Sequence, residues 1–289
     1  MTETQPTDMV DAGLRLWPQL RRHRLAIVSL FVVSIMTLVC FAAPFIAPYE
    51  FDAIDLDNIR QAPSPAHWMG TDDLGRDLFS RVLFGGRISI LIGVLAALFG
   101  TAMGTLVGAV AGFYGGRIDN FLMRITDVTY SIPTLPLLII LSSYTQATGT
   151  SMALIIGLLS WMATARVVRG EVLSIKQMLY VEAARSLGAS NFRIITRQVL
   201  PNALGPIVVG ATLAVGYAII LESSLSFLGL GVQPPVPTWG NLLMDAQSTM
   251  ATKPWLTIFP GIAILLVVLA VNFIGDGLQD ALDPSGRER

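Results

Sequence analysis

The residues best suited to a chemical role lie in a weakly polar segment, 182–201, between two long apolar stretches. Its landmarks are, in order, Glu182, Ala183, Ala184, Gly188, Leu200 and Pro201. Consecutive alanines on a short helix form a flat surface that can enter a groove of a partner protein, and Glu182 adds a charge for an ionic contact. The chemistry expected here is recognition of another protein, and the alternative is a helix that only seals the membrane interior.

Two short helices with a bend are expected within the polar loop 166–204. The first covers 178–187 and ends at Gly188, because a residue without a Cβ permits a backbone turn that other residues resist. Ser190 is placed to cap the N-terminus of the second helix, and Pro201 ends that helix. The paired alanines therefore belong to the first of the two helices.

A second group of candidates consists of ionisable side chains within or beside apolar stretches, namely Glu222, Asp127 and Asp276. An acid within a membrane span is costly and usually faces protein or a wet cavity. Glu222 also belongs to a ladder of small residues with a spacing of four, so it should lie on a packing face. These three residues are candidates for a translocation path. For Glu222 the alternatives are a carboxyl satisfied by a neighbouring helix and one that reaches the outer interface.

The acidic segment 48–87 contains combinations that could suggest metal binding or catalysis. His67 with Asp72 and Asp73 offers one imidazole and no thiolate, which is poor support for a metal site. Asp72 and Asp77 have no nucleophile or second partner for acid–base chemistry. We therefore expect neither catalytic nor metal-binding residues in this chain, and interpret the segment as a loop held by helix caps and salt bridges.

The elements that position these residues are predicted to be membrane-spanning helices. Of the 289 residues, 53% are hydrophobic and 13% are charged, whereas soluble domains carry about 25% charged residues. A span needs about 20 apolar residues, and six spans fit into the apolar stretches 25–49, 88–116, 128–165 (two spans), 206–230 and 255–275. Because these stretches show no alternation with a period of two, the predicted fold class is all-α, a polytopic membrane protein with six transmembrane helices.

The distribution of charge predicts the orientation of the chain in the membrane. Arginines precede the first span, and 166–201 holds six basic residues against two acids, whereas 48–87 holds seven acids and four arginines. Positive charge marks the cytoplasmic side, so both termini and 166–201 are expected in the cytoplasm. The basic run at 21–24 is interpreted as a topology anchor and not as a nucleic-acid site, and residues 14–20 could form a short helix on the membrane surface.

Two sequence features predict how the spans pack and bend. Small residues recur every four positions in the second span, at Ala96, Gly100, Gly104, Gly108 and Gly112. Such a stripe lets another helix approach the backbone closely, so the second span is expected inside a helix cluster. Pro133 and Pro136 are expected to break the third and fourth spans, either as a moving part or for packing.

The sequence Glu182-Ala183-Ala184-x-x-x-Gly188, followed by Leu200-Pro201, resembles the EAA loop of ATP-binding cassette (ABC) importer permeases. Further blocks are similar to the "C"-type subunit of the dipeptide/oligopeptide permease subfamily. They lie at 68–77, 85–89, 225–231, 239–241 and 275–284. The resemblance extends over nearly the whole chain, and the blocks in this order are highly specific.

The resemblance implies a type I ABC importer permease fold and a division of the chain. The implied segments are a cytoplasmic N-terminal segment (1–24), a first transmembrane helix (25–47), an extracytoplasmic loop (48–87), a five-helix permease core (88–277) with a cytoplasmic coupling loop (169–204), and a cytoplasmic C-terminal tail (278–289). The EAA residues would insert a coupling helix into a cleft of an ATPase.

The resemblance also implies partners embedded with this chain in membrane lipid. They are a second homologous permease, two cytoplasmic ABC ATPase domains and an extracytoplasmic solute-binding protein. The sequence has no GxxxxGK[ST] motif, the loop that cradles nucleotide phosphates. ATP and Mg²⁺ are therefore expected on the ATPase subunits, and this chain is expected to be a permease without enzymatic activity or a cofactor of its own.

The implied function is import of dipeptides or oligopeptides across the bacterial cytoplasmic membrane by alternating access. ATP would close the ATPase pair, the coupling helices would move with it, and hydrolysis would reset the inward state. One alternative is a permease of the same family for nickel or another small solute. Another is an ion-coupled carrier that uses Glu222, Asp127 or Asp276 as a proton site. A membrane scaffold or enzyme with no transport role is the remaining alternative.

Overall fold

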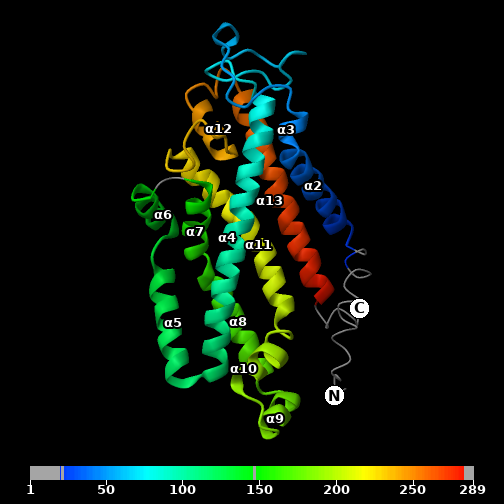
Figure 1. The fold of residues 1–289 in the computed structure, drawn as a ribbon, viewed down its shortest axis with the longest axis vertical. Coiled ribbons are helices and arrows are strands. Elements are labelled where there is room, and N and C mark those ends of the chain that lie inside the picture. Colours follow the sequence, from blue (N-terminus) through cyan, green and yellow to red (C-terminus); the bar gives the residue numbers. More distant parts are fainter. Residues whose placement is uncertain (1–19, 21–22, 146–147, 283–289) are drawn as a thin grey trace.

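The computed structural model describes residues 20, 23–145 and 148–282, and this part of the chain is built from helices without a strand (Figure 1). The helices are α2 (Arg24–Phe41), α3 (Ala43–Ile46), α4 (Leu78–Tyr114), α5 (Gly116–Ser131), α6 (Thr134–Ser143), α7 (Gly149–Leu158), α8 (Trp161–Ile175), α9 (Leu179–Ser186), α10 (Asn191–Ile194), α11 (Leu204–Phe227), α12 (Trp239–Ala246) and α13 (Trp255–Leu282). A 3₁₀ turn covers Leu56–Asn58 and a π turn covers Ile195–Val199. The predicted surface helix at 14–20, apart from Leu20, and the tail residues 283–289 lie outside the described residues.

Four helices, α2, α4, α11 and α13, are each long and apolar enough to span a membrane. Two bent pairs supply the rest: α5 meets α6 at 85°, and α7 meets α8 at 45°. With each pair counted as one span, the described chain has up to six. The all-helical, multi-span fold class expected from the sequence is therefore what the structure has.

Figure 1 shows α4 running through most of the length of the molecule, with α2 and α13 on one side and α5 to α8 on the other. At one end, which we call the α12 end, lie α12 and the loop that precedes α4. At the opposite end, the α9 end, lie α9 and α10. α4 packs mainly against α8, α11 and α7, so it is the central helix of the bundle.

The third span differs from the sequence expectation in where it begins. The stretch free of ionised residues begins at residue 128, but the helix that leads into the break begins at Gly116. α5 therefore contains Arg117, Asp119 and Arg124 as well as Asp127. The requirement for an uncharged run excluded this half of the span, although its two acids, Asp119 and Asp127, are paired with arginines of α8.

Pro133 accounts for the break between α5 and α6. Ile132 is extended, with φ −82° and ψ 127°, because the ring of a following proline clashes with a helical backbone at this position. Pro136 lies in the first turn of α6, where an amide hydrogen has no partner within the helix. Pro136 therefore leaves the helix intact.

The break between α7 and α8 has a different cause, and the expectation that prolines break the fourth span was wrong. No proline lies between Gly149 and Ile175. Instead the Ser160 hydroxyl donates to the Ile156 carbonyl at 2.7 Å, and the Leu159 amide donates to the same carbonyl at 3.1 Å. A side chain that competes for a helical carbonyl bends the helix.

The predicted stripe of small residues lies along the contact between α4 and the α7–α8 pair. A Cβ added at Gly104 would lie 2.5 Å from the Trp161 carbonyl oxygen and 2.6 Å from the Thr164 Cβ. One added at Gly112 would lie 2.9 Å from both the Arg169 carbonyl oxygen and the Val172 Cβ. The other two glycines of the stripe, Gly100 and Gly108, meet the backbone of the same pair. The backbones of α4 and α8 therefore touch along this stripe.

The segment before α4 is held by caps and ion pairs, as expected for a structured loop. Asp72 accepts hydrogen bonds from the Arg76 amide at 3.0 Å and Nε at 2.7 Å, and it also pairs with Arg81. Asp77 caps α4 by accepting from the Ser80 amide at 2.8 Å, and its other oxygen lies 2.9 Å from His67 Nδ1. The helix begins at Leu78, so the predicted loop 48–87 includes its first turns.

Asp245 of α12 extends this ion-pair network and ties α12 to the start of α4. Its Oδ2 lies 3.6 Å from Arg81 Nη1 and 3.8 Å from Arg76 Nη2. Burial raises the pKa of the Asp245 carboxyl above its usual range, although the two arginines act in the opposite direction. The polar residues that could suggest catalysis thus join the loop, α4 and α12.

The glycine contact between α4 and α8 predicts that two Gly→Ala substitutions will change the Tm in different ways. Gly108→Ala places a Cβ 2.9 Å from the Val168 Cβ and against the Ala165 carbonyl, and such overpacking costs about 1–3 kcal/mol. Gly170→Ala, on an open face of α8 with nothing within 4 Å, gains helix propensity of about 1 kcal/mol. We expect a lower Tm for Gly108→Ala and an unchanged or higher Tm for Gly170→Ala in detergent. Equal Tm values for the two variants would contradict the close contact.

Candidate functional site

The EAA segment forms a helical hairpin at the α9 end of the molecule. Glu182 and Ala183 are exposed on α9, and Ala184 is half-buried. Gly188 follows the helix with φ +77°, a left-handed conformation that costs a residue with a Cβ about 1–2 kcal/mol. The Ser190 hydroxyl caps α10 by accepting from the Arg193 amide. The bend and the cap lie where the sequence predicted them.

The polar loop begins later than its predicted start at residue 166, because α8 continues to Ile175. Residues 166–175 of the expected loop therefore belong to a long helix. The second short helix passes into a π turn at Ile195–Val199, and Leu200 and Pro201 follow it half-buried before α11 begins.

A small apolar core fixes the hairpin to the bundle. Val181 of α9, Ile194 of α10 and Val199 of the π turn are fully buried. They pack with Val168, Val172 and Ile175 of α8 and with Phe113 of α4. The side of the hairpin that faces away is apolar too, since Leu187 is 88% exposed and Phe192 is 75% exposed. The hairpin thus combines a fixed base with an open apolar surface.

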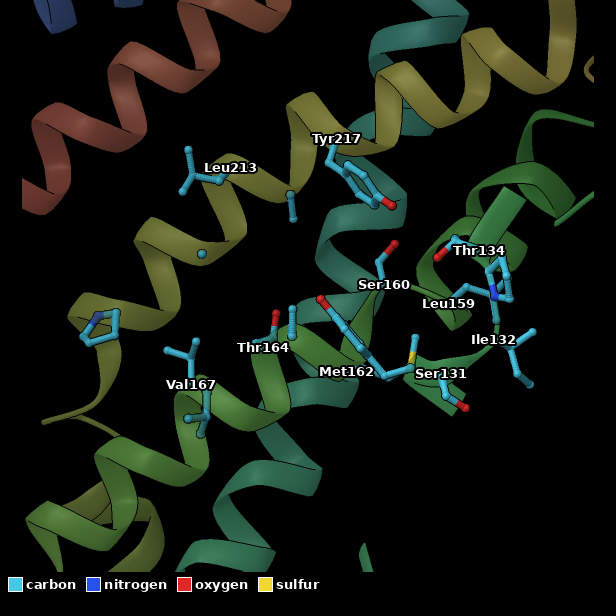
Figure 2. Close-up of a pocket in the computed structure, with 17 residues that line it drawn as sticks. Ser131, Ile132, Thr134, Leu159, Ser160, Met162, Thr164, Val167, Leu213 and Tyr217 are labelled. Atoms are coloured by element: carbon cyan, nitrogen blue, oxygen red, sulfur yellow. The ribbon is translucent and has the colours of Figure 1, made fainter. Parts of the chain in front are cut away.

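A cavity of about 630 Å³ opens near the middle of the bundle, between the two helix breaks and α11 (Figure 2). Both breaks contribute to its wall, through Ile132 and Pro133 on one side and Leu159 and Ser160 on the other. The wall from α11 comes from Pro206, Gly210, Leu213, Ala214 and Tyr217. The volume lies within the range of about 300–1,000 Å³ found for small-molecule sites.

The cavity wall carries hydroxyl groups but no ionised side chain. Its hydroxyl-bearing residues are Tyr130, Ser131, Thr134, Ser160, Thr164 and Tyr217. Figure 2 shows the Tyr217 ring extending from α11 toward Thr134. Hydroxyls donate and accept hydrogen bonds, so this wall can engage a polar but uncharged group without requiring a fixed charge.

Two ion pairs join α5 to α8 on the side of the cavity that faces the α9 end. Arg169 donates from Nε to Asp119 Oδ1 at 2.5 Å and from Nη2 to Oδ2 at 2.6 Å. Arg166 donates to Asp127 at 2.7 Å, and its guanidinium lies 4.4 Å from the centre of the Tyr130 ring. Tyr130 also lines the cavity, so the second pair lies directly beside the wall.

Glu222 lies in a buried polar network and does not line the cavity. It is 0% exposed and accepts hydrogen bonds from Ser89 of α4 at 3.0 Å and Ser226 of α11 at 2.7 Å. Ser89 in turn accepts from the Trp239 amide at 3.2 Å, at the start of α12. The Glu222 carboxyl is therefore satisfied by a neighbouring helix, α4, together with a serine of its own helix.

The other two candidates for a translocation path are also outside the cavity wall. Asp127 is paired with Arg166 next to it, and Asp276 is exposed on the last turns of α13. The structure therefore does not bring Glu222, Asp127 and Asp276 together. The hydroxyl residues of the wall were not predicted from the sequence. Their position beside Pro133 and around residue 160 was the signal that could have identified them. The pairing of Asp119 with Arg169 was not predicted either, although the charges of α5 could have indicated it.

The fold and the site together define a polytopic helical membrane protein, with spans around a cavity and an exposed apolar hairpin at one end. The chain matches two families, binding-protein-dependent transport system inner membrane component over residues 104–288 and the N-terminal TM domain of oligopeptide transport permease C over residues 14–63. It belongs to the binding-protein-dependent transport permeases and is the permease of an ABC importer.

Similar curated proteins carry the name glutathione transport system permease protein GsiD. The one from Pectobacterium atrosepticum is 42% identical over 269 residues, which is 93% of this chain and 89% of the relative. The one from Escherichia coli O6:K15:H31 is 44% identical over the same shares of both chains.

Solved structures with a similar fold are inward-facing conformations of the MetNI methionine ABC transporter. Two of them give TM-scores of 0.54 and 0.53 at 17% and 21% identity. Each match covers 69% of this chain, and 93% and 94% of the respective transporter chains. They show the fold of an importer permease.

The buried network of Glu222 predicts that this carboxyl has a structural role and does not transfer protons during transport. Glu222→Gln keeps the volume and one acceptor oxygen, and its amide nitrogen can donate to the other serine hydroxyl, so we expect stability and uptake close to wild type. Glu222→Leu leaves Ser89 and Ser226 without their acceptor, and each unsatisfied buried group costs about 1–3 kcal/mol. We expect a lower Tm for the leucine variant alone. A glutamine variant that is stable but inactive in uptake would contradict a purely structural role for this carboxyl.

Proposed function

We propose that this chain imports small peptides across the bacterial cytoplasmic membrane, as one of two permease subunits driven by partner ATPases. In this proposal the cavity is this subunit's share of the translocation path. The hairpin of α9 and α10 is the contact that receives the movement of the ATPase. Both termini and the α9 end face the cytoplasm, in agreement with the positive charge of 166–201.

The observation that carries the proposal is the continuity between hairpin and cavity. α8 contributes Met162, Thr164 and Val167 to the cavity wall. The same helix ends at Ile175, and three residues separate it from α9, which begins at Leu179. Because the hairpin core also buries Val168 and Val172 of α8, a displacement of the hairpin reaches the cavity through one stiff element.

The surface of the hairpin supports docking of a protein over sealing of a pore. Leu179, Leu187 and Phe192 are 74–88% exposed at the end of the molecule. Large exposed apolar patches rimmed by polar residues mark protein–protein contacts. Glu182 and Arg185, both exposed on α9, supply such a rim. The partner proposed for this surface is the cleft of a cytoplasmic ABC ATPase, whose subunits bind ATP and Mg²⁺.

The cavity wall and the relatives support a peptide as cargo. Peptides differ in side-chain charge but share amide groups, and a wall of hydroxyls without ionised residues can bond amides without selecting a charge. The printed name of the curated relatives is glutathione transport permease, and glutathione is a tripeptide. A second homologous permease would complete the path, and an extracytoplasmic solute-binding protein would deliver the cargo.

The proposed path is tested by filling it at Gly210. A Cβ at this position of the cavity wall meets nothing within 4 Å, so Gly210→Trp adds bulk to the cavity without a backbone clash. We expect at least about a tenfold loss of uptake of radiolabelled glutathione into liposomes that contain the assembled importer, because the path is blocked. Gly261→Trp, on α13 and also free of neighbours within 4 Å, is the matched control and should transport normally. Full uptake by Gly210→Trp would remove the cavity from the path.

The proposed coupling role is tested at Gly188. Gly188→Val forces a β-branched residue into a left-handed conformation at φ +77°, a genuine outlier for such residues, so the bend of the hairpin must change. We expect a severalfold loss of uptake with unchanged abundance in the membrane. Gly261→Val serves as the control at an ordinary helical position. If Gly188→Val transports at the wild-type rate, the hairpin does not couple ATP hydrolysis to transport.

A further inference from the structure

α5 is the one cavity-lining helix whose attachment does not rest on an apolar core. Among the described residues, the four apolar clusters contain members of α4, α6, α7, α8 and α11 but none of α5. Its large apolar side chains are exposed instead, among them Phe121 (66%) and Val128 (58%). Something other than apolar burial therefore holds α5 in place.

Each end of α5 has a joint at which the backbone leaves the helix. At the α4 end, Gly115 and Gly116 have φ +66° and +56°, conformations that glycine adopts at no steric cost. At the cavity end, Ile132 is extended before Pro133. Hinges are a few residues at element ends that absorb changes in φ and ψ, and α5 lies between two such points.

α5 packs against α4, the helix that precedes it, and against α8, and its ion pairs are made with α8. Arg169 meets Asp119 through two hydrogen bonds of 2.5 and 2.6 Å, and Asp119 is only 8% exposed. A bidentate pair between a guanidinium and a carboxylate fixes orientation as well as distance. The Arg169 side chain is 34% exposed, but its removal would leave the buried Asp119 charge uncompensated.

The second pair between the same helices is weaker. Side-chain exposure is 43% for Arg166 and 56% for Asp127, and a single 2.7 Å hydrogen bond joins them. Exposed ion pairs contribute little to stability. The comparison singles out Asp119 and Arg169 as the pair that secures α5.

α8 itself is fixed where this pair is made. The Lys176 ammonium donates to the Gly112 carbonyl at 2.6 Å, which joins the end of α8 to the end of α4. Gly112 also lies against the Arg169 carbonyl and Val172. Arg169 is thus presented to α5 by a rigid pair of helices that leads directly into α9.

We propose that Asp119 and Arg169 are positioning residues for transport: they clamp α5 to α8, so that the α5 wall of the cavity follows the hairpin when the ATPases move it. This inference rests on the proposed function. Without the clamp, α5 pivots between its two joints independently of α8, and the movement of the hairpin no longer sets the shape of the cavity. ATP is then hydrolysed without a matching movement of cargo.

The test is the number of ATP molecules hydrolysed per peptide imported, measured with the assembled importer in liposomes. Asp119→Asn removes the ionic partner, and Arg169→Lys keeps the charge but loses the planar fork. We expect both to raise the ratio about tenfold, within the range of coupling between linked sites. Asp127→Asn, in the exposed pair on the same two helices, is the matched control and should leave the ratio unchanged. A wild-type ratio for both clamp variants overturns the proposal.

A second measurement stays decisive if Asp119→Asn does not assemble. Asp127→Cys with Arg166→Cys, joined by a short thiol cross-linker, ties α5 to α8 covalently. Because the proposal has the two helices move together, uptake should persist in the cross-linked importer and the Arg169→Lys defect should be relieved. Loss of uptake on cross-linking would show that transport needs the helices to separate and would overturn the clamp. Failure of the peptide proposal is distinguishable, because it appears as absent uptake in the unmodified importer.

Discussion

The close contact between the backbones of α4 and α8 is the constraint on which the rest of the structure depends. Within a membrane, lipid is as apolar as leucine, so helices associate through packing and not through a hydrophobic driving force. Four glycines spaced by four residues make this packing possible, although each costs about 1 kcal/mol of helix propensity relative to alanine. The contact extends from the α7–α8 break to Val172 near the α9 end. It gives the long helix α4 a fixed partner from Gly100 to Gly112.

The position of α8 determines the location of each functional feature. Its first residues form one wall of the cavity, its last turn carries the hairpin, and Arg169 between them holds α5. The α12 end is built differently. There, the Asp72, Arg76, Arg81 and Asp245 network and the buried Glu222 join the loop, α4, α11 and α12 through polar contacts. Polar groups thus reinforce the α12 end, while the cavity lies between that end and the hairpin.

Local features of the fold were predictable from the sequence because they depend on neighbours within a few residues. The glycine stripe, the bend at Gly188 and the cap at Ser190 follow from helix periodicity and backbone sterics. The break in the fourth span was not predictable from proline, because a serine hydroxyl causes it. The charged half of the third span was missed because a run free of charges was required, whereas its two acids are paired with arginines about 40–50 positions away. The spacing of residues in the sequence does not show which distant charges pair. The clamp and the cavity wall could therefore be identified only from the structure.

The claim that the hairpin receives the ATPase is tested most directly by cross-linking from its paired alanines. Cys40 is the only cysteine of the chain and is buried, so Ala183→Cys introduces one accessible thiol. In the importer purified with its partners, a short thiol cross-linker should join Ala183→Cys to the ATP-binding subunit. The same reagent at Asp57→Cys, exposed at the opposite end, should join the extracytoplasmic binding protein or nothing, but never the ATPase. No adduct from Ala183→Cys in the assembled complex, or an ATPase adduct from Asp57→Cys, would contradict the account.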